Sequence, residues 1–215
     1  MPTTIAVVLA AGKGTRMKSE LPKVLIPVAG RPMIEYVLDA LSAAGVKQTI
    51  VVIGYRGDMV RKRLAARPGI TYVEQKEQLG TGHAVMAARD ALKRHDGPVL
   101  VVTGDSPLMQ STSIATLLKE FRHMNLACLL GTAYRSDPTG LGRILRDANR
   151  RFRGIVEERD ATPEEKQITE VNMSCYVFNC SDLLDSLGKI GQHNAQGEYY
   201  ITDCPGVLKS EGKLV

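Results

Sequence analysis

The sequence has no apolar run long enough to cross a membrane, and its first residues, MPTTIAVVLAAG, lack the basic region and cleavage site of a signal peptide. These absences predict a cytoplasmic protein with no membrane partner. Paired cysteine spacings are missing too, because no CxxC or zinc-like pattern links the four cysteines, Cys128, Cys175, Cys180 and Cys204. We therefore expect buried reduced thiols rather than disulfides or metal ligands.

An even distribution of charge is also missing. The 28 basic and 23 acidic side chains give a formal charge of +5, and the excess lies in two clusters, in residues 1–31 and 143–153. The first cluster is interleaved with glycine and has no aromatic side chain to stack on a base, so it fits a small polyanion such as a triphosphate better than a duplex. The second cluster fits the solvated tip of a hairpin. No nucleic-acid partner is expected.

The pattern of apolar residues predicts one α/β domain over residues 1–215, since the chain can bury one substantial core and has no repeat or low-complexity linker. Apolar runs typical of strands alternate with segments of helical spacing. Strands are expected at 4–10, 48–54, 70–75, 98–104 and near 126–133, and helices at 32–44, 57–66, 82–93 and 111–123. This order predicts a doubly wound, mostly parallel, Rossmann-like sheet that is covered on both faces and binds ligands at the carboxyl ends of its strands.

A different pattern begins at residue 142. The segment GRILRDANRRFRGIVEE predicts a β-hairpin that turns near Ala148 and Asn149, and VNMSCYVFN predicts a strand at 171–179. We expect residues of about 1–135 to form a nucleotide-binding half. Residues of about 136–215 would then form a sugar-binding half with a lid.

A glycine-rich segment, AAGKGTRM, follows the first predicted strand. Its small residues let the backbone approach a phosphate and point successive N–H groups at it, and Lys13, Arg16 and Lys23 add positive charge. It is not a Walker A loop, since no GKS or GKT follows, and Met17 stands where a dinucleotide fingerprint needs a third small residue. A glycine turn with solvated basic residues remains an alternative.

Two further segments follow predicted strands. VVTGDSPL places Asp105 at a strand's carboxyl end, where a carboxylate can hold Mg²⁺ that bridges phosphate oxygens. In EQKEQLGTGHAV, Gln75 and backbone groups could read the edge of a base. Thr81 could instead be only a helix cap, and a structural role for His83 is favoured over a general base.

Taken in order, these segments resemble the pyrophosphorylase domain of bacterial N-acetylglucosamine-1-phosphate uridyltransferases, within the sugar nucleotidyltransferases. The resemblance rests on LAAGKGTRM, LPKVL, EQLGTGHA, GDSPL, DPTGLGRI, GIVEERDAT and NAQGEYYITD. It implies that a sugar 1-phosphate attacks the α-phosphorus of UTP and that pyrophosphate leaves. Such chemistry depends on positioning and charge neutralisation rather than on a covalent intermediate.

The resemblance also implies a role for each matching residue. Arg16 and Lys23 would hold phosphates, Asp105 would bind Mg²⁺, and these three form the catalytic set. The nucleotide-binding set comprises Leu9, Ala10, Ala11, Gly12, Gly14, Gln75, Gly80, Thr81, Gly82 and Gly104. The sugar-binding set comprises Gly142, Glu157, Asn172 and Thr202.

The chain departs from the family pattern at several points. NMS replaces the usual NTG, which brings the larger Met173 near the expected sugar pocket, and Thr103 stands where tyrosine is usual. The family's second magnesium ligand, an asparagine, and its acetyltransferase domain would lie beyond Val215, so a truncated chain is one interpretation. Alternatives are the same reaction with another nucleotide or hexose 1-phosphate, and a non-catalytic nucleotide-sugar sensor. A monomer or weak oligomer is expected.

Overall fold

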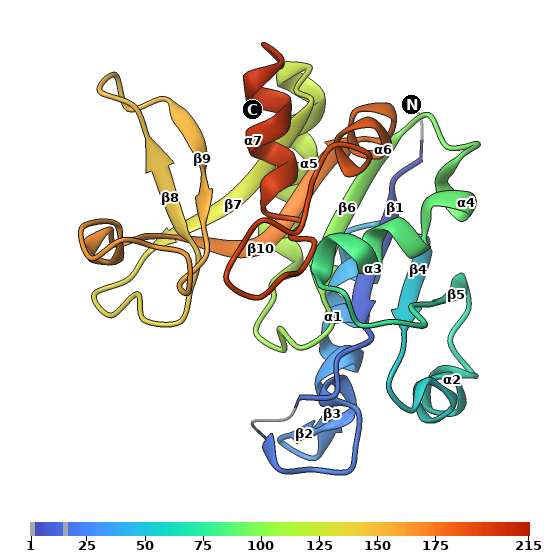
Figure 1. Cartoon of the computed structure of the whole chain (residues 1–215). Coiled ribbons are helices and arrows are strands. Elements are labelled where there is room, and N and C mark those ends of the chain that lie inside the picture. The colour runs from blue at the N-terminus through green and yellow to red at the C-terminus, as the bar shows by residue number, and fades with distance from the viewer. Residues whose placement is uncertain (1–2, 15–16) are drawn as a thin grey trace.

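The computed structural model describes residues 3–14 and 17–215, and its centre is a sheet in which four neighbouring strands run parallel (Figure 1). These strands lie in the order β5 (Ile70–Glu74), β4 (Gln48–Ile53), β1 (Ile5–Ala10) and β6 (Pro98–Thr103). Their nearly continuous apolar sequences suit strands buried on both faces. In β1, for example, Val7 lies opposite both Ile50 and Val101.

The second half of the chain completes the sheet with antiparallel strands. The long strand β10 (Glu170–Asn179) pairs with β6 along one edge and with β7 (Cys128–Tyr134) along the other. Val171 of β10 also pairs with Arg143 in β8 (Arg143–Arg146), which forms a hairpin with β9 (Phe152–Val156). The turn of this hairpin spans 147–151, as the sequence predicted, and its strand β9 packs beside α7 (Asp203–Ser210) in Figure 1.

The basic residues of this hairpin are not all solvated. Arg150, Arg151 and Arg153 are exposed, as expected for a hairpin tip. Arg143 contradicts the expectation, because its side chain is only 2% exposed and its guanidinium pairs with Glu158 at 2.7 Å. The reason is its position at the base of the hairpin, where β8 joins β10.

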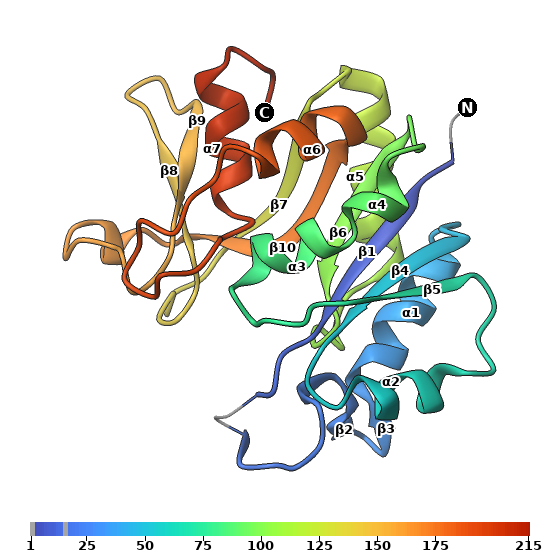
Figure 2. The same cartoon turned by 45° about the vertical axis from the view of Figure 1, so that its right-hand side comes forward.

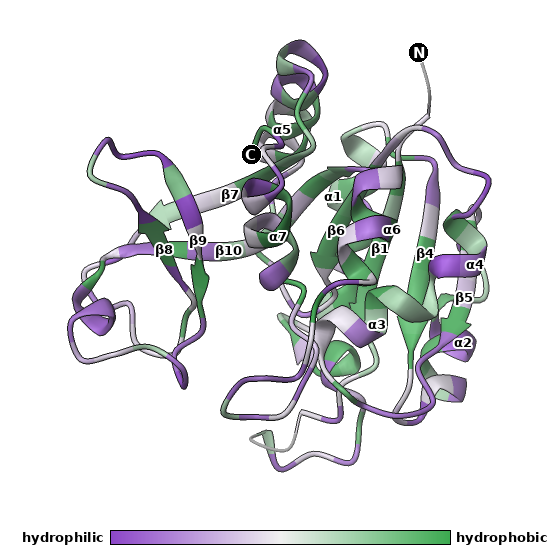
Figure 3. Ribbon diagram, turned by 45° about the horizontal axis from the view of Figure 1, so that its top comes forward, coloured by the Kyte–Doolittle hydropathy of each residue, from purple (hydrophilic) through white to green (hydrophobic). Residues whose placement is uncertain are grey.

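Helices cover both faces of the sheet, which confirms the doubly wound α/β prediction. One face packs against α1 (Met33–Ala43), α2 (Gly57–Leu64) and α5 (Ser111–Met124). The other packs against α3 (Thr81–Ala87), α4 (Arg89–Leu92), α6 (Cys180–Leu187) and α7 (Asp203–Ser210). Figure 2 shows α3, α4 and α6 in front of the sheet and α1 behind it, and Figure 3 shows the apolar character of the central strands.

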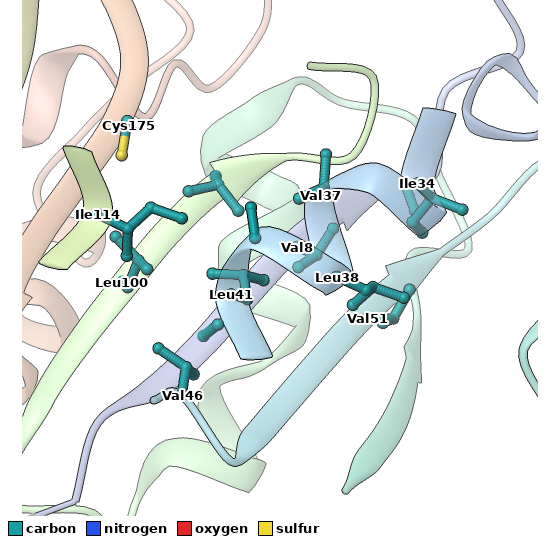
Figure 4. Close-up of a cluster of buried hydrophobic side chains, with 14 of the residues drawn as sticks. Val8, Ile34, Val37, Leu38, Leu41, Val46, Val51, Leu100, Ile114 and Cys175 are labelled. Atoms are coloured by element: carbon teal, nitrogen blue, oxygen red, sulfur yellow. The ribbon is translucent and has the colours of Figure 1, made fainter. Parts of the chain in front are cut away.

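Alternation along the strands builds two cores, one on each face. In β1, Ala6 and Val8 belong to the core beneath α1 and α5, while Val7 belongs to the core beneath α3 and α6. Figure 4 shows the first core, where Val8 lies among Ile34, Leu41 and other apolar side chains. The rigid cores fix where the strands end, and therefore where the loops at their carboxyl ends lie.

Some elements differ from the predictions. The helix expected at 82–93 is two short helices, because the chain turns at Ala88, whose N–H bonds the carbonyl of Val85 rather than that of Ala84. Short 3₁₀ turns at Lys23–Leu25 and Glu165–Gln167, and a small hairpin of β2 (Pro27–Val28) and β3 (Arg31–Pro32), lie between the main elements. The four cysteines are buried free thiols, as expected. None of the helices described here is long and apolar enough to span a membrane.

Candidate functional site

A cavity of about 340 Å³ lies at the carboxyl ends of the parallel strands. It unites segments that are far apart in sequence, because the ends of β1, β5 and β6 meet at one edge of the sheet. Of the residues predicted from the sequence, its lining includes Leu9, Ala11, Gly12, Lys23, Gln75, Gly80, Thr81 and Asp105. We call this cavity the nucleotide pocket. Arg16, which the sequence also places in this loop, lies outside the described residues.

The wall after β1 is formed by the glycine loop and Lys23. The N–H of Lys23 bonds the carbonyl of Gly12 at 3.4 Å. Gly14 has a φ of +68°, and a Cβ built there would lie 2.8 Å from the Cβ of Lys23, so the close approach needs glycine. Predicted residue Ala10 points away, since its side chain lies in the core beneath α1.

Opposite this loop, Asp105 carries negative charge at the end of β6. Its carboxylate forms an ion pair with the Lys23 ammonium, and the two side chains are 22% and 44% exposed. Gly104 does not line the pocket, but it extends the β1–β6 pairing by donating from its N–H to the carbonyl of Leu9 at 2.9 Å. Thr103, where tyrosine is usual, lines the pocket, and its Oγ1 lies 2.8 Å from Ser106 Oγ.

Gln75 presents its side chain to the pocket from the end of β5, although the residue is only 4% exposed. Its Nε2 donates to the carbonyl of Gly80 at 3.0 Å and lies 3.0 Å from Nδ1 of His83. The amide that the sequence assigns to base recognition is thus held from the turn before α3 and from α3 itself.

The turn before α3 is fastened to the segment before α7. Gly82 N–H donates to the carbonyl of Tyr199 at 2.7 Å, Tyr199 N–H donates to the carbonyl of Leu79 at 2.8 Å, and Ile201 N–H donates to Thr81 Oγ1 at 3.0 Å. We call this contact between residues 79–82 and 198–201 the clasp. The hydroxyl of Thr81 therefore serves the clasp, and the residue that caps α3 is Gly80.

Glycine is required on one side of the clasp. Gly80 has a φ of +103°, and a Cβ there would lie 2.5 Å from the backbone oxygen of Tyr199. A Cβ on Gly82 would lie 2.7 Å from Ile190 Cδ1 and 3.0 Å from that same oxygen. Gly82 does not line the nucleotide pocket, so its visible task is close packing.

The four predicted sugar-binding residues also lie close together, where β8, β9 and β10 meet the start of α7. Thr202 Oγ1 donates to Glu157 Oε1 at 2.9 Å, and the N–H of Asn172 donates to the carbonyl of Gly142 at 2.9 Å. A Cβ on Gly142 would lie 3.4 Å from Glu157 Oε2, so glycine leaves room for that carboxylate. None of the four lines the nucleotide pocket itself.

Burial affects both the pKa of Glu157 and the hydrogen bonding of Asn172 among the predicted sugar-binding residues. Burial raises the pKa of Glu157, the hydrogen bond from Thr202 opposes that effect, and the nearby charge of Asp160 adds to it. Asn172 is 5% exposed and uses both ends of its amide within the protein. Its Nδ2 donates to Tyr176 Oη at 2.6 Å, and its Oδ1 accepts from the N–H of Ser174 at 3.2 Å.

Met173 does not share the face of its neighbour Asn172. It lines an apolar groove of about 930 Å³ along α5 and β7, together with Cys175 of the core beneath α5. The replacement of NTG by NMS therefore does not put the Met173 side chain among the predicted sugar-binding residues. Ser174 takes the glycine position and adopts a φ of +52° in the irregular part of β10.

Sequence reasoning missed several residues that line the nucleotide pocket, namely Val24, Gln78, Ala84 and Glu198. Gln78 and Glu198 lie inside the motifs EQLGTGHA and NAQGEYYITD, so their positions in those motifs could have indicated them. Val24 and Ala84 are apolar and gave no signal apart from core packing.

Comparison with known proteins agrees with this geometry. The family description "MobA-like NTP transferase domain" matches residues 6–168. The chain belongs to the MobA-like NTP transferase family. This result confirms the predicted membership of the nucleotidyltransferases.

Curated relatives of this NTP transferase include three named bifunctional protein GlmU. The one from Heliobacterium modesticaldum is 49% identical over 98% of the chain and 45% of the relative. Those from Enterococcus faecalis and Halalkalibacterium halodurans are 43% and 44% identical over the whole chain, covering 46% and 47% of the relatives. The chain thus spans about half the length of these relatives.

Two solved structures share the fold. A UDP-glucose pyrophosphorylase complexed with UDP-glucose aligns with a TM-score of 0.81 at 17% identity, over 99% of this chain and 89% of its own. A putative glucose-1-phosphate thymidylyltransferase from Bacillus anthracis aligns with a TM-score of 0.81 at 21% identity, over 98% and 84%. At these identities the likeness speaks to the fold alone.

Proposed function

We propose that the protein transfers a uridylyl group from UTP to N-acetylglucosamine 1-phosphate in the cytoplasm, which yields UDP-N-acetylglucosamine and pyrophosphate. The observation that carries the proposal is the nucleotide pocket, where the glycine loop, Lys23, Asp105 and Gln75 converge from different strands. GlmU relatives at 43% to 49% identity over nearly the whole chain support the choice of reaction.

The residues of the pocket fit nucleotidyl transfer. A phosphate oxygen of the sugar 1-phosphate forms a bond to the α-phosphorus of UTP, and the bond to the bridging oxygen breaks so that pyrophosphate leaves with the electron pair. Lys23 and, from the sequence, Arg16 would neutralise the charge that gathers on the phosphates, while Gly12 lets the backbone approach them. No side chain has to form a covalent intermediate.

The residues of the pocket fit Mg²⁺ only if the phosphates of the nucleotide supply further oxygen ligands. Mg²⁺ takes oxygen ligands and commonly uses one or two carboxylates with substrate phosphates. Asp105 supplies one carboxylate on the pocket wall and already attracts a cation, Lys23. Across residues 3–14 and 17–215 there is no group of three or more histidine, cysteine or acidic side chains that could hold a metal alone. When bound, Mg²⁺ would neutralise phosphate charge, and Asp105 would hold it.

We further propose that the two halves of a single domain bind different substrates. Residues of about 1–135 bind the nucleotide, and residues of about 136–215 bind the sugar through Gly142, Glu157, Asn172 and Thr202. The clasp joins the two halves beside the pocket. We propose that the protein works as a monomer or weak oligomer on small-molecule substrates, without nucleic acid or membrane.

A substrate matrix tests the proposal. Purified protein with Mg²⁺ would be given UTP, CTP, dTTP or GTP with N-acetylglucosamine 1-phosphate or other hexose 1-phosphates, and pyrophosphate release measured. We expect the fastest release with UTP and N-acetylglucosamine 1-phosphate. Faster release with another pair would replace the substrates but keep the reaction, and UDP-sugar binding without release from any pair would indicate a sensor.

A matched pair of variants tests the metal role. Asp105→Asn should lower kcat at least 100-fold and raise the Mg²⁺ concentration needed for half-maximal rate, at roughly the scale of losing one strong electrostatic contact. Asp90→Asn, which changes an exposed carboxylate paired with Lys93, should leave both quantities unchanged. An unchanged Mg²⁺ dependence in Asp105→Asn would remove this residue from the metal site.

A further inference from the structure

The amide nitrogen of Gln75 has both of its protons engaged by the protein. Nε2 lies 3.0 Å from the carbonyl oxygen of Gly80, which can only accept a hydrogen bond. This contact fixes which end of the amide is nitrogen. The other proton of Nε2 then faces Nδ1 of His83, also at 3.0 Å.

This arrangement determines the state of the His83 ring. Because Nε2 of Gln75 donates, Nδ1 of His83 must accept, so the imidazole is neutral and carries its proton on its own Nε2. The ring is further held by stacking on Tyr199, with ring centroids 6.3 Å apart and planes 28° apart. Tyr199 belongs to the clasp, so the acceptor is fixed in place from two sides.

The atom of Gln75 that remains for a ligand is its carbonyl oxygen, Oε1. Within the described part of the chain, no backbone or side-chain group donates to Oε1. The fully buried side-chain atoms there that lack a hydrogen-bond partner are Tyr72 Oη and Arg143 Nε, so Oε1 of Gln75 is not among them. Since Gln75 lines the nucleotide pocket, Oε1 is open to a ligand.

We propose that His83 is a positioning residue for base selection, which acts by holding the Gln75 amide so that an acceptor, not a donor, meets the base. The inference rests on the proposed function, in which Gln75 reads the base of UTP. An acceptor pairs with the N3–H of uracil, whereas N3 of cytosine is itself an acceptor and would be repelled. A freely rotating amide could pair with either base, so a fixed orientation is what allows the site to distinguish uracil from cytosine.

Two substitutions separate this role from simple packing. His83→Phe keeps a ring against Tyr199 but removes the acceptor, while His83→Asn loses the ring and keeps an oxygen at the position of Nδ1. Tyr199→Leu tests the smaller contribution of stacking by itself, because it removes the stacking partner and leaves Nδ1 and the Tyr199 backbone contacts in place. Circular dichroism and thermal melting would confirm that each variant is folded.

The readout is the ratio of kcat/KM for UTP to that for CTP, measured by pyrophosphate release with N-acetylglucosamine 1-phosphate. His83→Phe should lower the ratio about tenfold, the scale of losing one of two hydrogen bonds that orient the amide. His83→Asn and Tyr199→Leu should stay within about threefold of the native ratio. An unchanged ratio in His83→Phe, or a larger loss in His83→Asn than in His83→Phe, would overturn the proposal.

Calorimetric titration with UTP and CTP in the presence of Mg²⁺, without sugar phosphate, distinguishes failure of this inference from failure of the proposed function. A native protein that binds UTP more tightly than CTP but releases no pyrophosphate would contradict the proposed reaction. The His83 variants would then be compared by the ratio of their affinities for UTP and CTP. Equal binding of UTP and CTP by the native protein would overturn the inference itself.

Discussion

Replacing Asp203 by asparagine should stabilise the protein at neutral and basic pH. Asp203 begins α7, and burial raises its pKa from 3.8 to about 6, with the charges of Glu157 and Asp160 adding to the effect. A carboxyl group whose pKa is raised by folding binds its proton more tightly in the folded state. Its contribution to stability is therefore fully present below about pH 3.8 and is lost as the pH rises through about 6.

The size of the effect follows from that difference in pKa. The difference between 3.8 and about 6 corresponds to an upper limit of about 3 kcal/mol, because one pKa unit is worth about 1.4 kcal/mol. Asp203 is only half-buried, so solvent screening reduces the expected gain to about 1–2 kcal/mol at pH 8. At pH 4 the gain should shrink to about a few tenths of a kcal/mol.

Urea denaturation at pH 8 and pH 4 measures this gain, followed by circular dichroism because the chain has no tryptophan. Asp58→Asn is the matched control, since Asp58 lies in the first turn of α2 but is exposed. It should give no gain, and it should lose about 0.3–1 kcal/mol of favourable interaction with the helix dipole. A gain for Asp203→Asn that is the same at both pH values, or a loss at pH 8, would refute the reasoning.

Three further substitutions probe the clasp, the phosphate site and the sugar-side carboxylate, and a fourth, Gly140→Ala, is the control for the first. Gly80→Ala should destabilise the fold by about 2–4 kcal/mol in urea denaturation, because both its φ of +103° and the nearby backbone oxygen reject a Cβ. Gly140→Ala, with a φ of +79° but nothing within 4 Å, should lose only about 1 kcal/mol. Lys23→Met should lower kcat/KM for UTP about 100-fold and leave the melting temperature nearly unchanged. A fall in kcat/KM of less than about threefold would argue against a contact between Lys23 and the phosphates. Thr202→Val should raise KM for the sugar 1-phosphate about tenfold and leave KM for UTP unchanged, because Glu157 loses its hydrogen-bond donor. Parallel changes in both KM values would instead indicate a general distortion of the fold.

The sheet could be predicted from sequence because its strands are defined by local patterns. Runs such as IAVVLA and PVLVVT are apolar throughout, which identifies strands covered on both faces. The break of the helix at Ala88 has no comparable signal, since the segment from Gly82 to Lys93 keeps a helical pattern of apolar residues across it. The burial of Arg143 was missed for a related reason, because the local sequence did not show that β8 would meet β10.

The pocket was predictable to the extent that strand ends determine it. Leu9 lies near the end of a strand that the sequence identifies, Lys23 and Asp105 come after such strands, and parallel strands bring their carboxyl ends to one edge of the sheet. Their functional roles remain predictions until they are tested. Gly82 and Gly104 do not line the pocket, and a Cβ on either would crowd neighbouring atoms, so the structure shows close packing there while their part in nucleotide binding stays a prediction.

The clasp shows why the remainder could not be predicted without coordinates. EQLGTGHA and NAQGEYYITD were each noticed as motifs, but no periodicity or spacing says that Thr81 accepts a hydrogen bond from a backbone amide 120 residues further along. The contact depends on α3 and α7 packing on the same face of the sheet. One consequence reaches Gln75, the side chain proposed to read the base. The backbone of Tyr199 bonds Leu79 and Gly82 on either side of Gly80 and its ring stacks on His83, while Gly80 and His83 hold the Gln75 amide. The segment that leads to the sugar-side residue Thr202 therefore also sets the geometry on the nucleotide side, so a substitution in either motif should be assayed against both substrates.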